Sequence, residues 1–103
     1  MSSPARYAGF ADFYPHYLRA HQNRTNRRLH FFGTTLVIGM LAGILATGAW
    51  GWLLLLPLAG YGPAWVGHFY FERNRPATFT QPLYSLVGDF RMYADTWSGK
   101  LPF

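Results

Sequence analysis

The feature that most constrains this chain is a stretch without Asp, Glu, Lys or Arg, which runs from Leu29 to Phe71. The stretch is 43 residues long, whereas one transmembrane helix needs only about 20 apolar residues. It therefore predicts two membrane spans joined by a hairpin turn. Because a hairpin returns the chain to the face where it started, His30 and His68 should lie at the same rim of the bilayer.

The predicted turn is the cluster Gly48–Trp52, which contains residue 49, the midpoint between the two histidines. About 19 helical residues on either side measure roughly 28 Å at 1.5 Å per residue, close to the roughly 30 Å of a hydrocarbon core. The predicted spans are therefore residues 26–47 and 52–72. Trp50 and Trp52 would anchor the turn at the far interface.

The second predicted span contains helix-perturbing residues. Pro57 and Pro63 both fall inside it, with Gly60 and Gly62 beside them. Proline removes a backbone donor and is a common cause of helix kinks. We therefore expect a kink or a short break near Gly60–Pro63.

Two further segments have the spacing of amphipathic helices, residues 6–21 and 82–96. Their apolar side chains recur at intervals of three and four residues, and we expect both helices to lie along the membrane interface. The same pattern would suit a helix that covers a soluble core. The expected fold is one all-α membrane domain over residues 1–103, a two-span hairpin flanked by two interfacial helices. The apolar positions are Phe10, Phe13, Tyr14, Tyr17 and Leu18 in the first segment, and Leu83, Leu86, Val87, Phe90 and Tyr93 in the second.

The charges of the chain fit a membrane protein better than a nucleic-acid-binding one. The net charge is +5, and only 13% of the residues are charged. The arginines gather on both sides of the uncharged stretch, as the positive-inside rule describes, and no recognisable nucleic-acid-binding module is present. Both termini should therefore face the cytoplasm, with membrane lipid rather than nucleic acid as the partner. These arginines are Arg19, Arg24, Arg27, Arg28, Arg73, Arg75 and Arg91.

Five polar residues converge on the predicted rim. Asn26 and His30 are four residues apart, as are His68 and Glu72, so each pair projects from one face of its helix. His21 precedes the first span by a short turn and could fold onto the same site. The chain has no cysteine, so a metal here would have nitrogen and oxygen ligands, which suits Fe(II), Zn, Mn or Cu. The alternative is a structural cluster of hydrogen-bonded His and Glu side chains.

The same residues carry a resemblance to a known family. Residues 21–33, HQNRTNRRLHFFG, resemble the opening motif of the 2-hydroxy fatty acid dioxygenase family of fatty acid α-oxidation in phytosphingosine breakdown. Residues 65–77, WVGHFYFERNRPA, resemble its second motif, and residues 82–92 are similar to its closing amphipathic segment. The resemblance spans nearly the whole chain and is most specific in the second motif.

The resemblance implies an Fe(II)-dependent dioxygenase that converts a 2-hydroxy fatty acid and O2 to the fatty acid one carbon shorter and CO2. By motif position, His21, His30 and His68 would bind the iron. Glu72 and Asn26 match further family positions, and Glu72 would serve as a fourth ligand or would orient an imidazole. The acyl tail would extend into lipid along the second span.

Other assignments are less specific. Arg73 or Arg75 could bind the carboxylate of the substrate, since guanidinium matches carboxylate in a bidentate way, although arginines at these positions also serve as topology determinants. The hairpin is short compared with longer eukaryotic relatives, which favours a homo-oligomer that shields the iron from solvent. The main alternative function is a non-catalytic membrane scaffold or lipid-binding protein with a structural His/Glu cluster. A zinc-dependent lipid enzyme is a further alternative.

Overall fold

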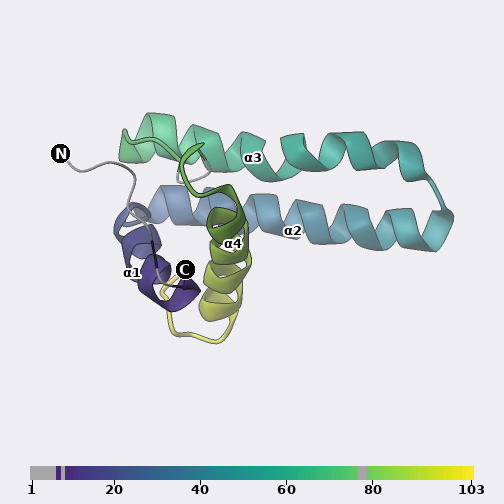
Figure 1. The fold of residues 1–103 in the computed structure, drawn as a ribbon. Helices are drawn as coiled ribbons and strands as arrows, with labels where there is room; N and C mark the ends of the chain where they lie inside the picture. The colour runs from purple at the N-terminus through teal and green to yellow at the C-terminus, as the bar shows by residue number, and fades with distance from the viewer. Residues whose placement is uncertain (1–6, 8, 77–78) are drawn as a thin grey trace.

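The computed structural model describes residue 7, residues 9–76 and residues 79–103. These residues form helices and turns with no strand, which confirms the all-α class. The predicted start of the first helix at Arg6 and the motif residue Ala77 lie outside the described residues. Two antiparallel helical arms lie side by side over most of the length of the molecule (Figure 1).

The first arm is helix α2, Arg24–Thr47. The side-chain oxygen of Asn23 caps its start by accepting hydrogen bonds from the backbone N–H groups of Thr25 and Asn26, as expected for an N-cap residue. Gly48 ends the helix in the left-handed conformation, with φ of 71°, which glycine adopts without steric cost. Within the part of the chain described, α2 alone is long and apolar enough to cross a membrane.

The second arm changes its helix type twice. It consists of a 3-10 helix η1 (Trp50–Leu55), an α-helix α3 (Leu56–Val66) and a π-helix η2 (Gly67–Glu72). Of the kink or short break expected near Gly60–Pro63, the break is wrong, because α3 runs through both residues and the changes of helix type lie at its two ends. Pro57 instead lies in the first turn of α3, where its missing N–H costs no hydrogen bond.

The two arms approach closely where both carry glycine. A Cβ atom on Gly33 would lie 2.9 Å from the carbonyl oxygen of Gly60, and a Cβ atom on Gly60 would lie 3.1 Å from Cγ2 of Val37. Small residues at such positions let helices pack backbone to backbone. The spacing between the arms is therefore set by these two glycines.

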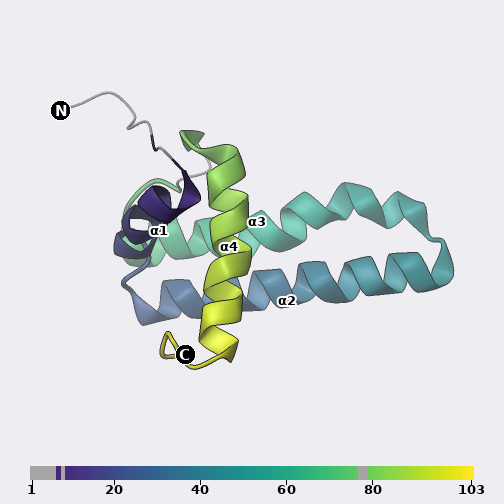
Figure 2. The same ribbon diagram turned by 60° about the horizontal axis from the view of Figure 1, so that its bottom comes forward.

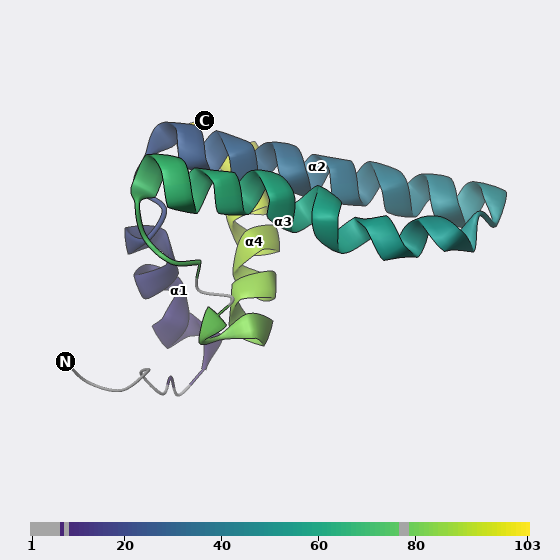
Figure 3. The ribbon, with the colours of Figure 1, turned by 90° about the horizontal axis from the view of Figure 1, so that it is seen from above.

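Helices α1 (Phe10–Arg19) and α4 (Pro82–Trp97) cover the end of the hairpin opposite its turn. Both run across the hairpin rather than along it, and the turn end projects beyond them (Figures 2 and 3). Their apolar faces enclose a small core of Phe13, Tyr14, Tyr17 and Met92. The two predicted amphipathic segments thus pack on each other and on the end of the hairpin that carries the histidines.

Candidate metal centre

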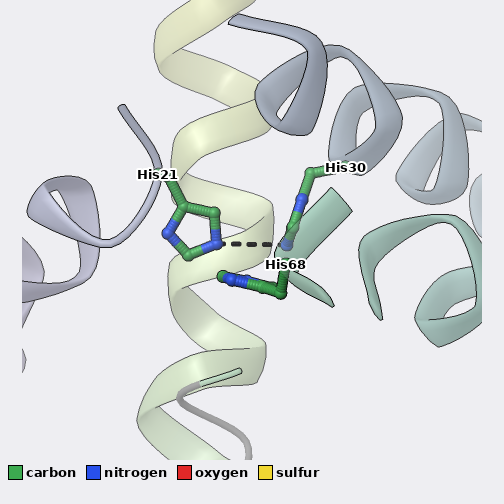
Figure 4. A group of neighbouring side chains, drawn as sticks. All are labelled: His21, His30 and His68. Carbon is green, nitrogen blue, oxygen red and sulfur yellow. Dashed lines mark hydrogen bonds between the residues drawn. The ribbon is translucent and has the colours of Figure 1, made fainter. Parts of the chain in front are cut away.

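Three buried histidines from three parts of the fold meet at the covered end of the hairpin. His21 lies in the turn between α1 and α2, His30 in the second turn of α2, and His68 in the π-helix η2. One ring nitrogen of each lies within 4.8 Å of the others, and the three side chains point toward one another (Figure 4). Each side chain is at most 5% exposed. The sequence-predicted convergence of these residues is therefore observed.

The Nδ1 atom of each imidazole is held by an oxygen acceptor. His21 Nδ1 lies 2.6 Å from the carbonyl oxygen of Tyr17, and His30 Nδ1 lies 2.9 Å from that of Asn26. His68 Nδ1 lies 2.7 Å from the side-chain oxygen of Asn74. Since these oxygens can only accept, each Nδ1 carries the proton and donates it. Each Nε2 of the neutral rings is then left with a lone pair.

This protonation pattern leaves acceptor atoms without a donor at the centre of the cluster. The Nε2 atoms of His21 and His30 lie 3.1 Å apart, yet neither neutral ring has a proton there to donate. Burial, together with the neighbouring His30 and His68, lowers the pKa of His21 well below its ordinary value, which opposes a second proton on that ring. Nitrogen ligands at about 2.1 Å from a tetrahedral metal are about 3.4 Å apart. The donor set therefore fits a bound cation.

Asn74 is a site residue that the sequence analysis missed. Its Nδ2 donates to the carbonyl oxygen of Ala20 at 3.1 Å, which fixes the amide so that its oxygen faces His68. Metal-binding histidines are typically oriented by such an acceptor on the second ring nitrogen. Asn74 is six residues from His68 and so fits no helical spacing, but it lies inside the motif of residues 65–77.

Glu72 and Asn26 lie beside the histidines without joining their ring nitrogens. Glu72 accepts a hydrogen bond from the backbone N–H of Asn23, next to the start of α2, where a negative charge is favourable. Asn26 is fully buried, and a Cβ atom on Gly67 would lie only 2.8 Å from its Cγ. Within the described structure the side-chain amide of Asn26 has no hydrogen-bond partner. Glu72 thus links the end of η2 to the start of α2, and the Asn26 side chain packs against Gly67.

Arg73 and Arg75 lie on the surface rather than at the histidines. Both are exposed and line a surface hollow together with Phe69, Tyr70 and Asn74. Arg73 adopts a left-handed conformation, with φ of 59°, and ends the π-helix.

A cavity of about 220 Å3 begins at His30 and runs between α2, α3 and α4. Asp89 of α4 lines it beside His30 and accepts a hydrogen bond from the hydroxyl of Tyr17. Burial raises the pKa of Asp89 to about 7. Asp89 was also missed from the sequence, where it forms no helical pair with any of the histidines.

Comparison with known proteins relates the chain to a protein family. No curated protein and no solved structure gave a match. The 2-hydroxy-palmitic acid dioxygenase Mpo1-like family matches residues 7–101, a range that contains all three histidines as well as Asn74 and Asp89. A match over nearly the whole chain establishes family membership. The chain therefore belongs to the 2-hydroxy-palmitic acid dioxygenase Mpo1-like family.

Proposed function

We propose that the protein is an Fe(II)-dependent dioxygenase of the membrane. It would convert a 2-hydroxy fatty acid and O2 to the fatty acid one carbon shorter, CO2 and water. The family name supports the substrate class. The observation that carries the proposal is that one ring nitrogen of each of three buried histidines lies within 4.8 Å of the others, while each Nδ1 donates to an oxygen acceptor.

The histidines are suited to hold a metal that also binds substrate. Three imidazoles supply three ligands, and no described Asp or Glu oxygen joins them, so further coordination positions would stay open to substrate and O2. Neutral nitrogen ligands without thiolate suit Fe(II) among other first-row ions. Fe(II) held there would supply the redox chemistry that O2 requires.

The neighbouring residues would keep the imidazoles in place. Asn74 fixes the ring of His68 through its side chain, and Asn26 fixes the ring of His30 through its carbonyl oxygen. Glu72 ties the end of the second arm to the start of α2 through Asn23. We therefore assign Glu72 and Asn26 orienting roles.

We further propose that both arms cross the membrane. The second arm is uncharged from Trp50 to Phe71, and its side chains are largely exposed, as expected for a surface in contact with lipid. Helices α1 and α4 run across the hairpin axis (Figure 3) and would lie in the interface with both termini in the cytoplasm. A homo-oligomer would further shield the site.

The test is metal analysis followed by oxygen uptake. The protein is purified anaerobically in detergent, and we expect about one iron per chain, lost in His30→Ala and His68→Ala. Oxygen consumption should require 2-hydroxypalmitic acid and should be absent with palmitic acid, which lacks the 2-hydroxyl group. A His68→Ala variant that keeps both metal and turnover would contradict the proposal. A protein that binds no metal after Fe(II) addition would instead be a scaffold or lipid-binding protein, and bound zinc without oxygen uptake would indicate a zinc enzyme.

A further inference from the structure

The cavity next to His30 has one polar end and a longer apolar part. His30, Thr34 and Val37 follow one another along the α2 side of it. Val37 is seven residues beyond His30, which corresponds to about 10 Å along a helix. At the level of Val37 and beyond, the walls are apolar and include Leu56 and Pro57 of the second arm. The cavity therefore leads from the histidines into the hairpin.

The shape of the cavity restricts what can enter it. Its volume of about 220 Å3 is below the roughly 300–1,000 Å3 of sites for drug-sized ligands. Gly60 and Ala64 line it on the α3 side, where they offer little or no side chain. The apolar lining suits a slender alkyl chain.

A cation lies on the other side of His30. Arg27 lines a narrow gap that shares His30 and Asp89 with the cavity and is too tight to hold a water molecule. The Nε atom of Arg27 is buried and has no hydrogen-bond partner within the described structure. A buried donor without a partner is costly, and a carboxylate is the acceptor that guanidinium binds best. A shift of the Arg27 side chain out of this gap would bring its guanidinium to a carboxylate held next to His30, one turn of helix away.

We propose that the cavity binds the acyl chain of the 2-hydroxy acid, with its carboxylate at Arg27 and its methyl end beyond Val37. The inference rests on the proposed function for the identity of the acid. It places the chain between the helices, whereas the sequence predicted a chain that lies in lipid along the second span. It also assigns the carboxylate to Arg27 instead of Arg73 or Arg75. Val37 would then be a specificity-determining residue for chain length.

The first test is photocrosslinking of the wild-type protein treated with EDTA, so that neither metal nor turnover is needed. The probe is a 2-hydroxy fatty acid that carries a diazirine near its methyl end. Adducts located by mass spectrometry should fall on Val37 or Leu56, and excess 2-hydroxypalmitic acid should abolish them. Adducts only on the exposed Leu54 and Leu58, or adducts that the competitor leaves unchanged, would overturn the inference.

The second test is chain-length preference. Val37→Phe should fill the far part of the cavity and lower kcat/KM for 2-hydroxypalmitic acid about tenfold, given the usual cost of overpacking. It should leave kcat/KM for 2-hydroxyoctanoic acid nearly unchanged. The control is the same substitution at the exposed Val87 of α4, which should alter neither value. Equal chain-length profiles for Val37→Phe and wild type would overturn the inference while leaving the proposed function intact.

The third test concerns the carboxylate. Arg27→Gln should weaken competition by 2-hydroxypalmitic acid in the crosslinking assay about tenfold and should spare competition by its methyl ester. Arg28→Gln is the matched control, because Arg28 is exposed and lies over the ring of Phe103. Equal competition in the two variants would overturn the assignment of Arg27. If 2-hydroxypalmitic acid abolishes the adducts but the protein shows no oxygen uptake, the proposed function is refuted and the acyl-chain site is retained.

Discussion

The side-chain oxygen of Asn74 lies 2.7 Å from Nδ1 of His68, although the two residues belong to different local structures. His68 is in the π-helix, and Asn74 follows it after Arg73, whose left-handed conformation turns the chain back. The backbone N–H of Asn74 also donates to the carbonyl oxygen of His68 at 3.0 Å. The end of the second arm thus folds onto the histidine that it positions.

Replacing Asn74 should therefore weaken metal binding. Asn74→Ala leaves His68 Nδ1 without its acceptor, and loss of such a partner typically lowers metal affinity about 10–100-fold. Asn74→Asp keeps an acceptor for His68 but places a second acceptor opposite the carbonyl oxygen of Ala20. Its loss of metal affinity should therefore be smaller than that of Asn74→Ala. Titration of each apoprotein with Fe(II) measures these affinities. The neighbouring exposed Arg75→Ala is the control, and an unchanged affinity in Asn74→Ala would show that His68 is oriented in another way.

Gly67→Ala should destabilise the fold near the site. The added Cβ would overlap the buried side chain of Asn26, with 2.8 Å to its Cγ and 3.1 Å to its Cα. Overpacking of this kind costs about 1–3 kcal/mol. Thermal unfolding in detergent should show a lower Tm. Gly39→Ala is the control, because nothing lies within 4 Å of a Cβ at that position, and equal Tm values in the two variants would refute the close contact.

The sequence predicted the elements and the histidine cluster because both follow from short-range patterns. Helical periodicity predicted the two amphipathic segments, and the length of the uncharged stretch predicted the two arms and the meeting of His30 and His68. The details that depend on backbone irregularity were not predictable in this way. The π-helix and the left-handed Arg73 place Asn74 at His68, and periodicity assumes neither. Likewise, Asp89 meets the site only because α4 crosses the hairpin, which is a property of tertiary packing.

The proposed topology can be tested with introduced cysteines, since the chain has none. In membrane vesicles of known orientation, Ala49→Cys at the turn and Ser98→Cys after α4 should react with a membrane-impermeant maleimide from opposite sides. Ser98→Cys should react from the cytoplasmic side, as the flanking arginines predict. Reaction of both from the same side would show that the hairpin does not cross the membrane. Prior blocking with a permeant maleimide provides the control for specific labelling.

The raised pKa of Asp89 predicts how the stability of the metal-free protein depends on pH. Burial raises this pKa to about 7, whereas an unfolded Asp titrates near 3.9. Between these values the folded state holds a proton that the unfolded state has lost. The contribution of Asp89 to the free energy of unfolding should therefore fall as pH rises from about 4 to 7, by at most about 1.4 kcal/mol per pH unit.

Asp89→Asn isolates this contribution. Asparagine keeps an oxygen that can accept from Tyr17 but cannot ionise, so the variant should gain stability relative to wild type as pH rises through the same range. The measurement is the difference in Tm between the two proteins, with EDTA present, at several pH values from 5 to 8. Asp12→Asn, at an exposed position of α1, is the control and should show a constant difference. A constant difference for Asp89→Asn as well would mean that Asp89 is ionised throughout this range and that its cavity is more hydrated than its surroundings indicate.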